Sequence, residues 1–252
     1  MSKKYKTLEG AIADMRSANV DFIQEYQNAI SEEMCDYFIS KFEKLDKEGK
    51  TREGQVQGYE NGELRRKVNK EAKSSSDIFL DSDGRNGCFN MSQDKKDKEM
   101  FDRLANAINR HIYLYSLHTG IDTPEYLGIN KDNFHLNFKN KEDCPEAPSN
   151  IMVDSICLRK YNKNTGGYYL PHYDAKSNVF RIVALIIYLN DTEHGGETEF
   201  PVLNRMIVPK RRSLVIFPSL FTHWHYGRKS NTDKYILISH ISKYPPKDKE
   251  KE

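Results

Sequence analysis

The sequence has few cysteines and no long apolar run, and each absence excludes a class of protein. No apolar stretch reaches the length that a membrane-spanning helix needs. The N-terminal Met1–Lys4 leads into a polar segment and not into the apolar core of a signal peptide. The cysteines form no Cys-x-x-Cys pair and no Cys/His spacing suited to structural zinc: Cys35, Cys88, Cys144 and Cys157. We therefore expect free thiols, no membrane partner and a cytoplasmic location.

The sequence also has no large excess of positive or negative charge. The 39 Lys and Arg residues against 37 Asp and Glu residues leave a formal net charge of +2, so no overall field would recruit nucleic acid. A chain of 252 residues can form one domain. We expect that domain over residues 1–243, with helical support and a long polar loop in 1–150 and the core in 151–243. The charged end, 244–252, is expected to be a disordered tail. The sequence predicts no oligomeric state.

Two segments of the N-terminal part have helical periodicity. Ser31 is a candidate N-cap, because Glu32 and Glu33 follow it in the first turn, where carboxylates suit the helix dipole. The apolar residues after this cap fall on one face: Met34, Phe38, Phe42 and Leu45. A second helix is predicted from about residue 95 to residue 118, with Gly120 as its stop. Its stripe consists of Met100, Leu104, Ile108 and Ile112. Both stripes should be buried against the rest of the fold.

Residues 46–94, between these helices, are rich in Gly, Ser, Asn, Lys and Glu and have little apolar periodicity. The pattern favours a long loop, with a pair of weak strands around Asp77–Leu80 as the alternative. Because loops of this length in compact domains often cover a functional site, we interpret the segment as a candidate lid.

From residue 151 onward the sequence is typical of β-structure. Four runs of β-branched and aromatic residues are separated by turn residues: 151–161, 180–189, 212–217 and 234–242. The second run is apolar on both faces, as expected for a strand in the interior of a sandwich. The predicted fold class is α+β and mainly β. Its core would be a double-stranded β-helix, a jelly roll of cupin-like type, with the N-terminal helices packed outside.

A His-x-Asp sequence in this half is a candidate metal site. On an extended backbone, residues two apart point to the same side, so the imidazole of His172 and the carboxylate of Asp174 can bind one ion. A second imidazole would complete a facial triad, whose opposite positions stay open for a co-substrate and O₂. The best candidates are His223 and His225, which lie between two predicted strands, and spacing alone does not choose between them.

Three blocks together resemble the prolyl 4-hydroxylase-like branch of the 2-oxoglutarate/Fe(II) dioxygenases. They are Arg159-Lys160-Tyr161 with 167–174, Tyr188-Leu189-Asn190 with 195–201, and Phe217-Pro218-Ser219 with His225 and Lys234-Tyr235. They follow the order of the family over about residues 151–242. The chain also departs from the family pattern. The turn before His172 is two residues longer, the segment before Lys234 is one residue shorter, and His240 stands where many relatives have tryptophan.

The resemblance implies a role for each site residue. Relatives place the distal iron ligand eight positions after the Phe of the Phe-Pro-Ser block, which selects His225. The distal carboxylate of 2-oxoglutarate needs a cation inside an apolar cavity, and the family places it at Lys234. Tyr161 and Thr198 match the hydroxyl groups beside that carboxylate. The substrate-side candidates are Tyr169, Arg181 and His223, and no catalytic residue is expected beyond the metal site.

The resemblance also implies an enzyme, a 2-oxoglutarate-dependent dioxygenase similar to procollagen-proline 4-dioxygenase. It would use Fe(II), 2-oxoglutarate and O₂, with ascorbate as an accessory, and convert 2-oxoglutarate to succinate while an unactivated C–H bond is hydroxylated. The implied substrate is a prolyl residue in a peptide or protein. Three alternatives stay open: the same iron chemistry on another residue or a small molecule, a non-catalytic jelly roll that contains a metal, and a cupin-type isomerase or hydrolase.

Overall fold

The computed structural model describes residues 21–60, 63–82, 84, 88–119, 151–165, 167–175 and 180–243. The predicted helix stop at Gly120, the thiol of Cys144 and the predicted tail over 244–252 lie outside these residues. The other three cysteines are free thiols, as expected. Neither helix in the described part of the chain has the length and apolar character needed to span a membrane.

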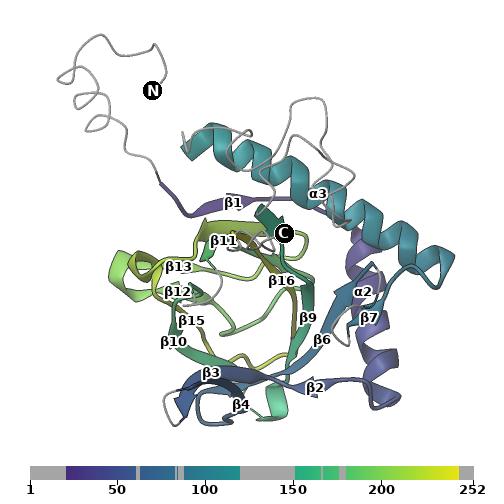
Figure 1. The fold of residues 1–252 in the computed structure, drawn as a ribbon, viewed down its shortest axis with the longest axis horizontal. Coiled ribbons are helices and arrows are strands. Elements are labelled where there is room, and N and C mark those ends of the chain that lie inside the picture. Colours follow the sequence, from purple (N-terminus) through teal and green to yellow (C-terminus); the bar gives the residue numbers. More distant parts are fainter. Residues whose placement is uncertain are drawn as a thin grey trace, which may run out of the picture.

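Two curved, mainly antiparallel sheets enclose the interior of the described structure (Figure 1). The major sheet has the strand order β1-β14-β11-β16-β9-β6-β2, with β7 beside β6 and β8 beside β16. Its strands are β1 (Gln24–Tyr26), β2 (Arg52–Glu53), β6 (Ser76–Asp81), β7 (Phe89–Asn90), β8 (Ile151–Val153), β9 (Ile156–Tyr161), β11 (Phe180–Tyr188), β14 (Leu214–Pro218) and β16 (Lys234–Lys243). The minor sheet, in the order β13-β12-β15-β10-β5, consists of β5 (Lys73–Ser74), β10 (Tyr168–His172), β12 (Thr198–Phe200), β13 (Arg205–Ile207) and β15 (His225–Gly227).

Both predicted helices are present, and they cover the outer face of the major sheet (Figure 1). Helix α2 (Glu32–Lys47) begins at the predicted cap, because the Ser31 hydroxyl accepts a hydrogen bond from the Met34 N–H at 3.2 Å. Helix α3 (Lys95–Thr119) follows the predicted bounds closely. The apolar stripes of both helices are buried in one cluster with outward-facing residues of the major sheet.

The long strands of the major sheet are apolar on both faces because each face is covered. In β11, Leu185 and Ile187 pack towards the helices, whereas Ala184 and Ile186 belong to a second cluster between the two sheets. The predicted run 151–161 is divided into β8 and β9 at Asp154-Ser155. The predicted jelly roll with external helices is confirmed.

The segment 46–94 is not the single long loop that its composition favours. It contributes β2, β5, β6 and β7, together with a separate two-stranded hairpin of β3 (Gln55–Glu60) and β4 (Glu63–Val68). Strand β6 pairs with β9 over five register positions and extends the major sheet. The alternative of weak strands near Asp77–Leu80 therefore describes this part better. The hairpin is polar along both strands, so alternating hydrophobicity gave no signal for it.

Candidate metal centre

The two imidazoles of the candidate site lie on neighbouring strands of the minor sheet. His172 ends β10 and His225 begins β15, and the two residues are register partners in this antiparallel pair. Asp174 follows in a tight turn whose backbone is fixed by the Ser219 carbonyl, which accepts hydrogen bonds from the N–H groups of Asp174 and Ala175 at 3.1 and 2.8 Å. Strand pairing and this turn therefore place all three side chains at the same end of the sheet.

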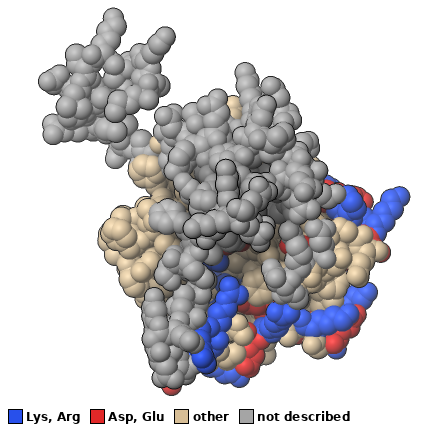
Figure 2. All heavy atoms as spheres, in the orientation of Figure 1, with Lys and Arg blue, Asp and Glu red and all other residues tan. Residues whose placement is uncertain are grey.

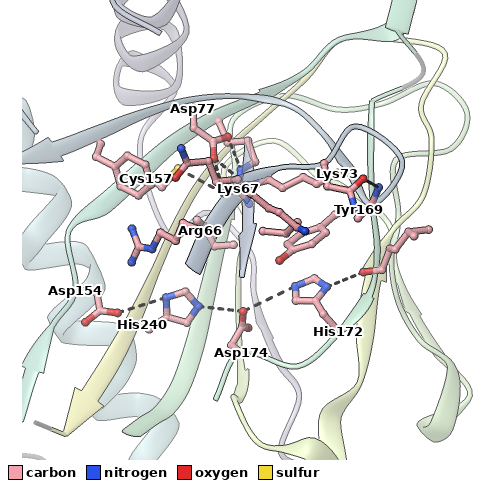
Figure 3. Close-up of a pocket in the computed structure, with 18 of the residues that line it drawn as sticks. Arg66, Lys67, Lys73, Asp77, Asp154, Cys157, Tyr169, His172, Asp174 and His240 are labelled. Carbon is pink, nitrogen blue, oxygen red and sulfur yellow. Dashed lines mark hydrogen bonds and ion pairs between the residues drawn. The ribbon is translucent and has the colours of Figure 1, made fainter. Parts of the chain in front are cut away.

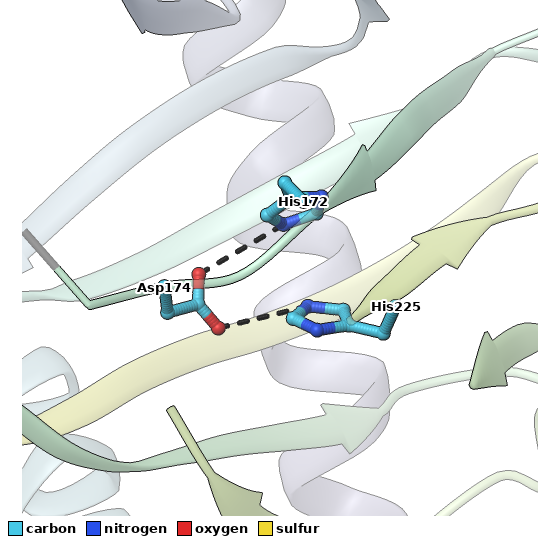
Figure 4. A group of neighbouring side chains, drawn as sticks. All are labelled: His172, Asp174 and His225. Carbon is cyan, nitrogen blue, oxygen red and sulfur yellow. Dashed lines mark ion pairs between the residues drawn. The ribbon is translucent and has the colours of Figure 1, made fainter. Parts of the chain in front are cut away.

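These three side chains converge (Figure 4). One ligand atom from each of His172, Asp174 and His225 lies within 4.8 Å of the other two. The Nε2 atom of His172 is 3.8 Å from Asp174 Oδ1, and the Nε2 atom of His225 is 3.6 Å from Asp174 Oδ2. Within the described residues, this is the group of His, Cys, Asp and Glu side chains whose geometry suits a metal ion.

The second nitrogen of each imidazole faces a backbone carbonyl. His172 Nδ1 lies 2.8 Å from the Leu170 oxygen, and His225 Nδ1 lies 3.1 Å from the His223 oxygen. Because a carbonyl can only accept, each Nδ1 must carry the proton, which leaves the Nε2 lone pair free to bind a metal. The backbone thus selects the tautomer that a ligand requires.

The buried carboxylate fits a cation. Asp174 is 8% exposed, and its Oδ2 atom has no hydrogen-bond donor among the described residues. Burial alone would raise the pKa of Asp174, but the nearby His240 and His225 hold it well below its usual range, so the group is an anion. Burial, with His225 beside it, lowers the pKa of His172 to about 3. A neutral imidazole next to an anionic oxygen without a donor is a donor set suited to a divalent iron ion.

Figure 3 shows His240 between Asp174 and Asp154 in the wall of the site. His240 Nε2 lies 3.4 Å from Asp174 Oδ1, and its Nδ1 lies 3.8 Å from Asp154 Oδ2. Arg181 donates to Asp154 Oδ2 at 3.1 Å and reaches the Asp174 carbonyl at 3.5 Å. Asp154 was not identified as a site residue from the sequence, nor was the contact of His240 with the Asp174 carboxylate. The period-two pattern of β16 could have indicated His240, because it places this residue on the same face as Lys234.

Lys234, the predicted co-substrate anchor, is buried at the start of β16. Its side chain is 2% exposed, and its Nζ atom donates to the Gly196 carbonyl at 2.7 Å. No carboxylate of the described residues forms an ion pair with it. Burial, with the charge of Arg159 adding to it, lowers the pKa of this ammonium to about 7. Glu197 acts on the ammonium only through space and raises its pKa less than burial lowers it. A buried cation without a carboxylate in direct contact is an energetic cost that a bound carboxylate would offset.

The other two predicted co-substrate residues lie next to this ammonium. Tyr161 is the register partner of Lys234, and its ring centroid is 4.5 Å from Nζ. Thr198 shares a hydrogen bond of 2.7 Å with the hydroxyl of Tyr188 and faces Gly227 across the sheet. A Cβ atom on Gly227 would lie 3.7 Å from the Lys234 Nζ. The structure therefore brings the three residues together between the two sheets.

A cavity of about 930 Å³ opens beside the metal centre. Tyr169, His172 and Asp174 form part of its wall, and the β3–β4 hairpin borders it. The Tyr169 ring stacks on the His172 ring at 3.6 Å between centroids, which places it on the cavity side of the ligand as predicted. Lys234, Tyr161 and Thr198 do not line this cavity.

The two remaining candidates have separate roles. Arg181 lines the cavity and pairs with Asp154. His223 is not part of the three-residue group. Its ring nitrogen contacts the Thr222 hydroxyl at 2.9 Å, and only its backbone oxygen reaches His225. The geometry therefore favours His225 over His223 as the distal ligand.

Comparisons with known proteins agree with this geometry. Residues 156–242 match the family model described as the 2OG-Fe(II) oxygenase superfamily, in which 2OG stands for 2-oxoglutarate. This range contains the three converging side chains and Lys234. Comparison with curated protein sequences finds no match.

Solved structures share the fold at low sequence identity. A prolyl hydroxylase from Trichoplax adhaerens, in complex with a peptide fragment of hypoxia inducible factor, gives a TM-score of 0.58 at 15% identity and covers 95% of each chain. A prolyl-4-hydroxylase from Pseudomonas putida gives 0.58 at 13% identity, over 95% of this chain and 100% of that one. The viral collagen prolyl hydroxylase of Paramecium Bursaria Chlorella virus-1, in complex with 2-oxoglutarate, gives 0.50 at 16%, over 90% and 99%.

Proposed function

We propose that this protein is a 2-oxoglutarate/Fe(II) dioxygenase of the prolyl 4-hydroxylase-like type and that it hydroxylates a prolyl residue of a peptide or protein. The match to the oxygenase family model and the fold shared with prolyl hydroxylases support this proposal. The observation that carries the proposal is the convergence of His172, Asp174 and His225 beside an open cavity, in a chain that also buries the ammonium of Lys234. An open metal site next to a cavity suits a reaction, whereas a structural metal site is closed by protein ligands.

In this proposal the Nε2 atoms of His172 and His225 and the carboxylate of Asp174 hold the iron. When bound, the iron would activate O₂ with 2-oxoglutarate as the source of electrons. The protein orients these ligands. The carbonyl oxygens of Leu170 and His223 fix the two imidazole tautomers, and the carbonyl of Ser219 holds the turn that carries the carboxylate.

Lys234 would bind the distal carboxylate of 2-oxoglutarate, with the hydroxyl groups of Tyr161 and Thr198 beside it. Charge complementarity supports this role, because the ammonium is buried and forms no ion pair with a carboxylate of the described residues. The bound carboxylate would take the place of the Gly196 carbonyl as the partner of the ammonium.

The peptidyl substrate is supported by the shape of the site and by the structural neighbours. The cavity is bordered by a hairpin and exposes the Tyr169 face of the metal centre, which suits an extended chain entering from outside. One neighbour was solved with a bound peptide. Ascorbate as an accessory and a cytoplasmic location stay predictions.

The test is aerobic turnover of 2-oxoglutarate with proline-containing peptides, followed by mass spectrometry of the peptide. Succinate formation and a gain of one oxygen on proline are expected for the native protein, and neither is expected for Asp174→Ala. Turnover of 2-oxoglutarate without any oxygen on proline would refute the prolyl substrate and leave the enzyme class intact. Absence of 2-oxoglutarate turnover in the iron-loaded protein would refute both.

A further inference from the structure

A second group of charged side chains is buried in the cavity wall, away from the metal ligands. It consists of Lys73 on β5, Asp77 on β6 and Arg159 on β9, which are 3%, 2% and 6% exposed. Asp77 and Arg159 are register partners, and the guanidinium donates to both carboxylate oxygens at 2.7 and 2.9 Å. Lys73 donates to the same carboxylate at 2.9 Å. We call these three residues the charged cluster; Figure 3 labels Lys73 and Asp77.

The charged cluster has one more positive charge than negative charge. Two cations share one carboxylate, and Asp77 already accepts from Arg159, Lys73 and the Ser75 hydroxyl. The other side chains in contact with Arg159 are neutral, because burial raises the pKa values of Cys157 and Tyr161. Burial and the charge of Arg159 also lower the pKa of Lys73, as expected where like charges are enclosed together.

Among the described residues of the cavity wall, no other acid is available to balance this charge. Glu53 pairs with Lys70, Asp154 pairs with Arg181, and Asp174 belongs to the metal centre. The wall contains the cations Arg52, Arg66, Lys67, Lys73, Arg159 and Arg181. Arg66 and Lys67 are exposed on the hairpin and form no ion pair with another described residue. On the face seen in Figure 2, Lys and Arg side chains lie along the lower edge with Asp and Glu side chains between them, where Figure 1 draws the hairpin and β2.

The charged cluster lies close to the reacting end of the cavity. The Lys73 Nζ is 5.2 Å from the centroid of the Tyr169 ring, and that ring stacks on His172. One aromatic side chain therefore separates the cation from a candidate metal ligand. The Nη1 atom of Arg159 has only the Tyr161 hydroxyl, at 3.5 Å, as its hydrogen-bond partner in the described structure. Its donor capacity is thus largely free for a ligand.

We propose that the charged cluster is a carboxylate subsite, which binds an acidic side chain of the substrate next to the residue that is hydroxylated. The proposal rests on the proposed function and adds a substrate class to it: peptides with Glu or Asp beside the target proline. Arg159 and Lys73 contact the acidic group, and Asp77 is a positioning residue that holds both cations in place. The basic hairpin at the rim suits further acidic residues of the same peptide.

The single variants Arg159→Met and Lys73→Met test the subsite without leaving an unpaired buried charge. Each removes the excess positive charge, while Asp77 keeps one cationic partner, so both variants should fold. Asp77→Asn is unsuitable, because it would leave two buried cations without an anion. Lys70→Met is the matched control: it also removes one positive charge, but from a side chain that is 73% exposed and paired with Glu53.

The experiment measures binding of two peptides that differ in one residue, Gly-Ala-Glu-Pro-Gly-Ala and Gly-Ala-Gln-Pro-Gly-Ala. Isothermal titration calorimetry is performed on protein loaded with Mn(II) and 2-oxoglutarate under anaerobic conditions, so no turnover is involved. A charged hydrogen-bonded partner predicts a preference for Glu of about 10- to 100-fold. Both cluster variants should lose this preference, and Lys70→Met should keep it. Equal affinity for the two peptides, or a preference that survives in both variants, would overturn the proposal.

A second measurement separates the subsite from the choice of proline. N-acetylglutamate and N-acetylglutamine are titrated against the same loaded protein, and only the first should bind, in a manner that Arg159→Met abolishes. This result would support the subsite even if no proline peptide were hydroxylated. If the two cluster variants instead weaken 2-oxoglutarate as strongly as Lys234→Met does and leave the peptide preference unchanged, the cluster serves the co-substrate and the proposal is wrong.

Discussion

The two sheets of this jelly roll differ in how they are stabilised and in what they carry. Strands of the major sheet reach nine and ten residues in β11 and β16, and both faces are covered. Strands of the minor sheet have two to five residues, and side chains such as Leu170 and Met206 are about half exposed on it. Yet His172 and His225 lie on the minor sheet. Stability is thus concentrated in one sheet and metal binding in the other.

The largest expected effect follows from removal of a candidate metal ligand. His225→Ala should weaken metal binding by more than the roughly 10- to 100-fold that loss of an outer-shell partner costs. Its thermal stability without metal should fall less than that of a variant in the apolar layer beneath the helices, because His225 lies on the minor sheet and, among the described residues, its ring meets an aromatic ring of the major sheet only at Phe217. Metal titration by calorimetry and thermal unfolding of the metal-free protein measure the two effects.

His223→Ala is the matched control for this prediction. Its backbone carbonyl remains and can still accept from His225 Nδ1, so metal affinity should fall by less than about tenfold. A greater loss in His223→Ala than in His225→Ala would transfer the ligand assignment to His223. A large loss of thermal stability in His225→Ala would show that the minor sheet also supports the fold.

The reverse test removes a side chain from the apolar layer beneath the helices. Leu158→Ala in β9 should cost about 2–5 kcal/mol of unfolding free energy, because the residue is fully buried and a cavity would remain. Met206→Thr in β13, where the side chain is 48% exposed, should change it by no more than about 0.5 kcal/mol. Chemical denaturation measures both. Similar costs at the two positions would contradict the contrast between the sheets.

Lys234 is where the two regions depend on each other, since it starts a strand of the major sheet and faces the minor one. With its pKa near 7, the free ammonium loses its proton as pH rises, whereas a bound carboxylate needs the charged form. The affinity for 2-oxoglutarate should therefore fall by up to about tenfold for each pH unit above about 7. Equilibrium binding to the metal-loaded protein between pH 7 and pH 9 measures this dependence.

Lys234→Arg is the control, because a guanidinium stays charged over this range. Its affinity for 2-oxoglutarate, even if lower, should be nearly independent of pH above 7. Lys234→Ala should raise the apparent KM for 2-oxoglutarate and leave metal content nearly intact. The same slope in the native protein and in Lys234→Arg would assign the titration to another group.

The smallest expected effect concerns the helical support. Ser31→Ala removes the cap of α2 and should cost about 1 kcal/mol of stability. The cap is on the outer layer, so turnover of 2-oxoglutarate at a temperature well below unfolding should not change. A loss of turnover comparable to the loss of stability would show that the outer layer positions the site. Differential scanning calorimetry and succinate formation provide the two readouts.

The sequence predicted the helices and the long strands of the major sheet because their signals are local. Periodic apolar residues mark α2, α3, β11 and β16, and the covered faces of these elements explain why the pattern is strong. The minor sheet was missed as a set of strands, since runs of two to five residues with one exposed face carry little periodicity. Its key residues were found only through the motif that contains them.

The charged cluster shows a different limit. Arg159 lies two positions from both Cys157 and Tyr161 in β9, so the three side chains share one face of the strand. The inward direction of Arg159 could therefore have been inferred from the period-two pattern. The partners of Arg159 could not have been inferred in this way, because Asp77 and Lys73 come from a segment whose composition favours a loop. An ion pair between residues 82 positions apart depends on strand register, which a single sequence does not reveal.

The register of β10 against β15 has a consequence for assembly of the protein. His172 and His225 face each other across this pair, and a slip by one residue would turn one imidazole to the opposite side of the sheet. An ion that requires both rings therefore binds only the correctly aligned strands and stabilises them by mass action. Metal binding would therefore favour the correct register of β10 and β15, which the short strands of the minor sheet specify only weakly.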